Sequence, residues 1–156
     1  MAKLSAGLLL YRRPSDPEVL LVHPGGPFWR NKDDGAWSIP KGEYLPGEDP
    51  LEAALREFGE ELGIAPPDPS DAVPLGELRQ PSGKRVLAWA LEGEADVGDV
   101  RSNTFTMEWP PRSGRTQEFP EVDRAAWFDL AHGRRKLLRG QVAFLDRLTE
   151  LIGSDA

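Results

Sequence analysis

The sequence predicts a single-domain α/β sandwich held by its own hydrophobic core, and three observations lead to this prediction. The 156 residues include no cysteine, which excludes disulfides, thiolate zinc sites and cysteine nucleophiles. A chain of this length can bury a sufficient hydrophobic core without such links. Apolar runs of strand length alternate with two amphipathic helical segments, one in the first half of the chain and one at its end. We therefore expect one domain over residues 1–156.

The chain begins with two predicted strands. Leu4–Tyr11 and Val19–His23 are apolar runs joined by a turn at Pro14–Pro17, which favours a hairpin. Residues 23–35 combine glycine, proline and charged residues and are expected to form a loop, followed by a short strand around Trp37–Ile39. The apolar run near the N-terminus is too short for a signal peptide or a membrane span, so we expect a cytosolic protein.

A helix is predicted directly after Asp49. Asp49 suits the N-cap, Pro50 suits the first helical position, and Glu52 completes an Asp-x-x-Glu capping box. Gly63 supplies a C-terminal stop. Between these signals the apolar residues form one stripe at helical spacing: Leu51, Ala54, Leu55, Phe58 and Leu62.

The other face of this helix carries a cluster of acids. Glu57, Glu60 and Glu61 follow the spacing i, i+3 and i+4, which makes them neighbours on the helix surface. Carboxylates so close repel one another, and a divalent cation that prefers oxygen ligands, Mg²⁺ or Mn²⁺, would offset the repulsion. The alternative is an ordinary solvated helix face, which is what most charged faces are.

The rest of the chain predicts further strands and a final helix. Residues 103–109 alternate Phe, Met and Trp with polar residues, which is typical of a half-buried strand. In chain order, the expected elements are a loop at 65–72, strands at 73–79 and 85–92, a strand at 103–109, a loop at 110–116, a strand at 122–128 and a helix at 140–152.

The segment Gly42–Ile64 resembles the Nudix box, G-x5-E-x7-R-E-U-x-E-E-x-G-U, in which U is a bulky apolar residue. The preceding residues WSIPKG at 37–42 are similar to the W-x-x-P-K-G stretch of many Nudix hydrolases. The resemblance implies a mixed β-sheet between helices and a hydrolase that cleaves a nucleoside diphosphate linked to another group. Every defined position of the box is filled: Gly42, Glu48, Arg56, Glu57, Phe58, Glu60, Glu61, Gly63 and Ile64.

The resemblance assigns the acids of the helix to a metal. It implies that Glu57, Glu60 and Glu61 are catalytic metal ligands for Mg²⁺ or Mn²⁺, and that the carbonyl of Gly42 adds a further ligand. A metal held in this way can polarise a phosphorus centre and activate a water that splits a P–O–P bridge. Either Glu61 or a carboxylate outside the box would deprotonate or orient that water.

Other residues have candidate supporting roles. The family pattern pairs Arg56 with Glu48 to brace the loop against the helix, whereas the helical spacing alone allows an ion pair of Arg56 with Glu52. Lys41 is a candidate phosphate contact, with a solvated lysine as the alternative. Trp37 is a candidate substrate contact that could stack on a base, although tryptophans more often belong to the core.

Two acids and two aromatic residues outside the box are further candidates. Many Nudix enzymes carry an extra acid late in the chain, and Glu118 and Glu121 both suit it, although each is equally compatible with a solvated surface position. The Phe28–Trp29 pair in the first loop could stack on a base. His23 and His132 have no second histidine at ligand spacing and are assigned no chemistry.

The charge balance bears on the partners. A net charge of −7 argues against a surface for duplex nucleic acid and leaves a nucleotide-type small molecule as the expected substrate. The resemblance includes MutT-like nucleoside triphosphate pyrophosphohydrolases and diadenosine polyphosphate hydrolases. A nucleotide-sensing module without turnover and an RNA 5′-end pyrophosphohydrolase are the alternatives, and both a monomer and a homodimer are compatible with the sequence.

Overall fold

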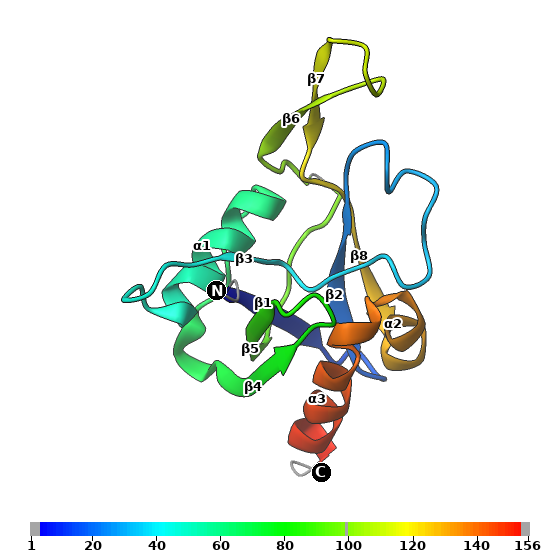
Figure 1. The fold of residues 1–156 in the computed structure, drawn as a ribbon. Helices are drawn as coiled ribbons and strands as arrows, with labels where there is room; N and C mark the ends of the chain where they lie inside the picture. The colour runs from blue at the N-terminus through cyan, green and yellow to red at the C-terminus, as the bar shows by residue number, and fades with distance from the viewer. Residues whose placement is uncertain (1–3, 99, 154–156) are drawn as a thin grey trace.

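A mixed β-sheet forms the centre of the fold, drawn in Figure 1 from a computed structural model that describes residues 4–98 and 100–153. The strand order is β4-β5-β1-β2-β8, and β3 pairs with β1 off this path. β1 and β5 run parallel, while the other pairs are antiparallel. The strands are β1 (Leu4–Arg12), β2 (Glu18–Pro24), β3 (Lys41–Glu43), β4 (Val73–Arg79), β5 (Arg85–Glu92) and β8 (Val122–Asp129).

One edge of β1 is shared by two strands. Tyr11 and Arg12 pair with β2, whereas residues 5–7 pair with β3. The segment before β3 enters between them, because Ser38 bridges to Val22 of β2 and the amide of Leu8 donates to the carbonyl of Pro40 at 3.0 Å. The strand expected at Trp37–Ile39 is therefore wrong in its bounds. Isolated bridges occur there instead, Pro40 lacks the amide needed to continue a ladder, and the regular strand begins at Lys41.

Successive side chains of β1 pack into two different apolar layers. Leu8 and Leu10 belong to the cluster that contains Phe58 of helix α1 (Pro50–Leu62). Leu9 and Tyr11 belong to the cluster on the other face, to which α3 (Ala143–Gly153) contributes Phe144, Leu145 and Leu148. Strand residues alternate between faces, so this split places one helix on each face of the sheet. The predicted sandwich is confirmed, and Figure 1 shows α1 and α3 on opposite sides of the sheet.

Helix α1 has the predicted bounds, but its N-terminus differs in detail. Asp49 has the extended backbone of an N-cap (φ −67°, ψ 120°), yet its side chain makes no capping hydrogen bond, so the capping box is not formed. The C-terminus is as expected. Gly63 adopts φ 71° and its amide donates to the carbonyl of Gly59 at 2.8 Å. A Cβ at residue 63 would lie 2.4 Å from the carbonyl oxygen of Arg101, so glycine is also required for close packing.

Several elements were not expected from the sequence. β7 (Thr116–Pro120) pairs with β6 (Thr104–Glu108) in a two-stranded sheet that projects from the main sheet (Figure 1). α2 (Leu130–Lys136) follows β8 directly, and the final helix starts at Ala143 after the short 3₁₀ turn η2 (Arg139–Gln141), later than expected. A second 3₁₀ turn, η1 (Pro69–Asp71), lies in the loop before β4. Within the described part of the chain, no helix combines the length and apolar character needed to cross a bilayer.

Candidate active site

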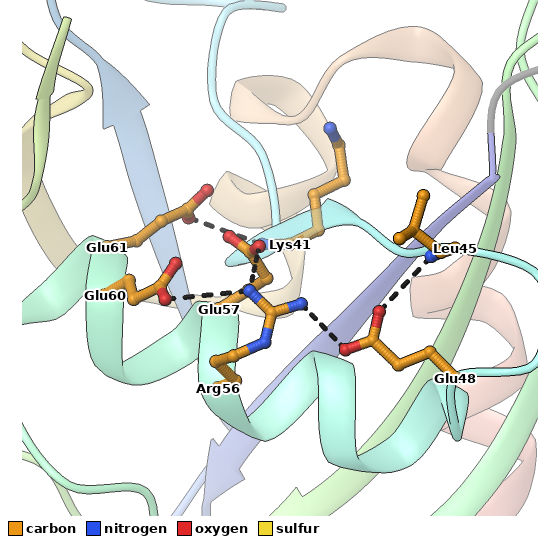
Figure 2. A network of polar contacts seen from close by, with 7 residues as sticks. All are labelled: Lys41, Leu45, Glu48, Arg56, Glu57, Glu60 and Glu61. Atoms are coloured by element: carbon orange, nitrogen blue, oxygen red, sulfur yellow. Dashed lines mark hydrogen bonds and ion pairs between the residues drawn. The ribbon is translucent and has the colours of Figure 1, made fainter.

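The acids of α1 lie beside the segment that leads into β3. Figure 2 shows Glu57, Glu60 and Glu61 on one stretch of the helix, with Lys41 above them. The amide of Lys41 donates to Oε2 of Glu61 at 3.3 Å, which ties the segment to the helix. The acidic face predicted from the i, i+3, i+4 spacing therefore points at the backbone of residues 41 and 42 and not only at solvent.

Gly42 is packed against one of these acids. A Cβ built on Gly42 would lie 2.0 Å from the carboxyl carbon of Glu57. Any side chain at this position would displace that carboxyl group, so the glycine is required by the close approach of backbone and carboxylate. The place of the first glycine of the box thus has a steric reason.

Arg56 connects the acids with the preceding loop. Its Nη2 donates to Oε2 of Glu48 at 3.1 Å, and its Nη1 donates to Oε1 of Glu57 at 3.0 Å and lies 3.6 Å from Oε1 of Glu60. Glu48 in turn accepts from the amide of Leu45 at 3.2 Å (Figure 2). The pairing with Glu48 that the resemblance implies is present. One guanidinium therefore braces the loop and partly neutralises two acids.

Burial changes the protonation of the site. The pKa of the Glu61 carboxyl is raised to about 8, mainly by loss of solvent; Lys41 opposes the shift, and the charges of Glu57 and Glu121 contribute to it. Burial is also the main cause that raises the pKa of Glu57, with repulsion from Glu60 second. The pKa of Glu121 is raised by burial and by Glu60. The acids are thus mutually repelling and poorly solvated.

A cavity of about 190 Å³ opens next to these acids. Lys41, Glu61 and Glu121 are the charged residues of its lining, and the rest of the lining is largely apolar. Burial lowers the pKa of the Lys41 ammonium, and the positive charge of nearby Lys84 lowers it further. Among the described residues, the apolar residues of the lining are Val22, Pro24, Trp29, Ala36, Val122 and Leu138, and Ser38 is its one uncharged polar residue.

The structure separates the candidates outside the box. Glu121 lines the cavity, whereas Glu118 lies on β7 opposite Thr106 and is exposed. Trp37 is only 4% exposed, and its indole Nε1 donates to Asp33 at 2.8 Å. Its rings lie in the core instead of in the cavity, and Trp29 of the preceding loop lines the cavity in its place. Of the aromatic candidates, Trp29 and not Trp37 therefore lines the cavity.

Two functional candidates were missed by sequence reasoning. Lys84 directly precedes β5, far from the box in sequence, and it comes near Lys41 because β5 and β3 both pair with β1. Buried His23 contacts Asp123 through Nδ1 at 2.9 Å and the carbonyl of Lys32 through Nε2 at 2.6 Å. It anchors the loop that carries Trp29. No local signal distinguishes either residue.

The donor set fits a divalent cation, although it is not closed around one. As the side chains stand, the described residues contain no group of three or more His, Cys, Asp or Glu that could hold a metal ion. Arg56 forms ion pairs with Glu57 and Glu60, and Glu61 accepts a hydrogen bond from the amide of Lys41. Hard carboxylate oxygens that repel one another, cradled against a bare Gly42 backbone, nevertheless suit Mg²⁺ or Mn²⁺.

Sequence comparison places the chain among known proteins. A profile of the NUDIX domain family matches residues 1–148. The RNA pyrophosphohydrolase of Rhizobium meliloti (strain 1021) is 34% identical over 96 residues, which cover 53% of this chain and 54% of that protein. The RNA pyrophosphohydrolase of Gluconacetobacter diazotrophicus is 32% identical over 130 residues, covering 79% of this chain and 69% of the relative. The chain thus spans about half the length of the first relative and about two thirds of the second.

Solved structures share the architecture. An Ap4A hydrolase binary complex from C. elegans has a TM-score of 0.65 at 22% identity, over 96% of this chain and 98% of that chain. The NUDIX domain of Shewanella oneidensis NrtR, complexed with ADP ribose, has a TM-score of 0.64 at 16% identity, over 97% and 89%. The MutT protein from Methanosarcina mazei Go1 has a TM-score of 0.59 at 21% identity, over 96% and 94%. At these identities the likeness concerns the fold alone.

Proposed function

The chain belongs to the Nudix family, and on that premise we propose that it is a divalent-metal-dependent hydrolase of a nucleoside diphosphate linked to another group. The observation that carries the proposal is the cavity whose lining combines Glu61, Glu121 and Lys41 with largely apolar residues. Phosphates require cations and metal-bound carboxylates, while a base requires an apolar wall. The cavity offers both at once.

The acids hold the cation and the proton in this proposal. Glu57, Glu60 and Glu61, with the carbonyl of Gly42, would hold Mg²⁺ or Mn²⁺. When bound, this ion neutralises charge on the phosphate oxygens and lowers the pKa of a coordinated water. Two carboxylates line the cavity from different segments, Glu61 from α1 and Glu121 from the single residue between β7 and β8. Either one can accept the proton of the attacking water.

Cationic side chains bind the phosphates. The positive charge of Lys84 lowers the pKa of the Lys41 ammonium, so the two cations repel in the free protein and an anion beside them would be favoured. Arg56 keeps the acids and the loop in register through Glu48 and Glu57. We therefore assign Lys41 and Lys84 to phosphate binding, and Arg56 to positioning.

The apolar part of the cavity lining would receive the base. Trp29 belongs to this lining, and the ammonium of Lys32 lies 5.1 Å from the centroid of the Trp29 ring. Aromatic stacking tolerates any base, because every base presents a π-face. The volume of about 190 Å³ is below the ~300 Å³ of pockets for drug-sized ligands, which suits a single base better than a whole dinucleotide.

The substrate class divides into small nucleotides and RNA 5′ ends. Small nucleotides, which are nucleoside triphosphates and dinucleoside polyphosphates, are in line with the fold likeness to Ap4A hydrolase and MutT proteins. RNA with a 5′ polyphosphate is in line with the sequence relatives, which are RNA pyrophosphohydrolases. A nucleotide-sensing module is the remaining alternative.

Turnover measurements test the proposal. Purified protein with Mg²⁺ is incubated with nucleoside triphosphates, dinucleoside polyphosphates, ADP ribose and 5′-triphosphorylated RNA, and the products are resolved. We expect cleavage of at least one P–O–P bridge, which stops in EDTA and falls by orders of magnitude in Glu61→Gln. Tight nucleotide binding without turnover of any of these compounds would replace the enzyme by a sensing module.

A further inference from the structure

A projecting hairpin presents an aromatic face beside the cavity. In the antiparallel pair β6–β7, Phe105 lies opposite Phe119, and Trp109 continues the ladder by donating from its amide to the carbonyl of Arg115 at 2.9 Å. Opposite residues share one face of a sheet, and alternate residues along a strand do so too. Phe105, Met107 and Trp109 therefore share a face with Phe119 and Arg115.

The acids of the hairpin lie on its other face. Glu118 is opposite Thr106, and Glu108 is opposite Thr116, one residue out of phase with the aromatic set. Glu108 also accepts a hydrogen bond from the amide of Arg112 at 2.7 Å. Because side chains alternate between the two faces of a strand, these acids do not lie on the aromatic face. The chain is negative overall, but Glu108 and Glu118 add no negative charge to that face.

The aromatic face meets the loop that lines the cavity. The ring of Phe105 lies 3.0 Å from the position of a Cβ on Gly26, and the rings of Phe28 and Trp109 meet edge to face, with centroids 5.9 Å apart. Phe28 remains 62% exposed despite this contact. Its neighbour Trp29 lines the cavity, so two successive residues of one loop contribute to the aromatic face and to the cavity lining.

The tip of the hairpin adds positive charge at a strained position. Arg112 has φ 62°, in the left-handed region that disfavours side chains, while Gly114 two residues later supplies the usual residue for such a conformation. A strained non-glycine residue points to a use for its side chain. Among the described residues, Arg112, Arg115 and Arg30 form no ion pair, so their charges are available to a partner.

We propose that Phe28, Trp109, Arg112 and Arg115 bind the nucleotides that follow the first one in a single-stranded substrate whose 5′ phosphates enter the acidic site. Aromatic rings beside cations are the components of single-strand binding: bases stack and backbone phosphates pair with arginine. A cavity of about 190 Å³ suits a single base, so later nucleotides would lie outside it. This inference rests on the proposed function and selects an RNA 5′ end over a mononucleotide.

Binding is tested without turnover. A 5′-triphosphorylated tetranucleotide RNA carrying a 3′ fluorophore is titrated with protein in EDTA at several salt concentrations, and anisotropy is followed. Phe28→Ala should weaken binding roughly tenfold, as loss of a stacked base implies. Arg112→Gln combined with Arg115→Gln should lower the salt slope by roughly 0.7 per lost phosphate contact. Arg79→Gln with Arg135→Gln removes the same charge from exposed positions elsewhere, and should change neither.

Kinetics with Mg²⁺ separates the outcomes. The variants should lose kcat/KM for the tetranucleotide roughly tenfold while retaining turnover of a nucleoside triphosphate, which also shows that they are folded. Equal losses on both substrates, or no loss on the tetranucleotide, overturn the proposal. So does a loss confined to a dinucleoside tetraphosphate, since the surface would then serve one further nucleoside. Absence of all turnover refutes the proposed hydrolase alone, because the binding test still reports on this surface.

Discussion

Replacing Glu61 by glutamine should stabilise the metal-free protein while it destroys the site. The carboxyl group is buried, its pKa is about 8, and its neighbours Glu57 and Glu121 repel its charged form. Glutamine removes the charge and keeps an oxygen to accept the hydrogen bond from the amide of Lys41. A residue retained at a cost to stability is what an active site requires.

The magnitude follows from the change in pKa on folding. The pKa of Glu61 rises from its ordinary value of 4.5 to about 8 in the folded chain. Between these values the folded state keeps a proton that the unfolded state has lost, so stability falls as pH rises through the window. At pH 7, about 2.5 units above the unfolded value, the loss is about 3 kcal/mol. For a domain of this length, it lowers the melting temperature by roughly 6–12 °C.

Thermal unfolding in EDTA at pH 5 and pH 7 measures this effect. In EDTA, Glu61→Gln should melt several degrees above the native protein at pH 7 and close to it at pH 5. Added Mg²⁺ should raise the melting temperature of the native protein but not that of Glu61→Gln. Glu52→Gln is the control, because Glu52 is an exposed acid of the same helix. If the glutamine variant at 61 melts below the native protein at both pH values, the carboxyl group is not the buried, repelled acid that we describe.

Further substitutions test the remaining parts of the site. Arg56→Gln should lower the melting temperature only slightly, since exposed ion pairs contribute about 1 kcal/mol or less, yet reduce kcat about 10-fold to 100-fold as supporting contacts of a metal site do; unchanged kcat would contradict the brace. Gly42→Ala should abolish turnover, because the new Cβ meets a carboxylate, whereas Gly59→Ala has space and should stabilise the helix by about 1 kcal/mol; both are measured by turnover and thermal unfolding. Trp29→Ala should raise KM for nucleotides roughly tenfold, as loss of a stacked base implies, and equal KM values would remove it from the base site.

Local signals predicted the centre of the site because they act within one helix. The apolar stripe, Pro50 and Gly63 define α1, and the spacing of the acids then follows from helix geometry alone. The cap at Asp49 shows the limit of such signals. A suitable residue at the N-cap has the expected backbone but does not make the side-chain hydrogen bond.

Elements without an apolar period were not predicted. β7 consists of Thr, Gln, Glu, Phe and Pro, and only Phe119 is partly buried, so its pairing with β6 leaves no clear pattern. α2 is seven residues long and contains Gly133, which is buried against Val19. Its stability comes from tertiary packing, which a local pattern does not contain.

The lining of the cavity depends on tertiary structure. Trp37 and Trp29 are both aromatic residues near the box. Trp37 forms a backbone bridge with Leu137 and its indole is buried in the core, whereas Trp29 lies in a loop and lines the cavity. Glu121 and Glu118 are separated in the same way. Glu121, between β7 and β8, lines the cavity, whereas Glu118 pairs within the β6–β7 sheet and is exposed. Residue type alone does not distinguish the members of either pair.

Hydrolysis in ¹⁸O-labelled water tests the central claim most directly. Native protein with Mg²⁺ and the preferred nucleotide should release a phosphate product that carries one ¹⁸O atom. Glu61→Gln should slow this release by orders of magnitude, and Glu52→Gln should not change it. A native protein that consumes no diphosphate compound under these conditions, or a Glu61→Gln variant with native turnover, would contradict the assignment of the cleavage site to the acidic face of α1.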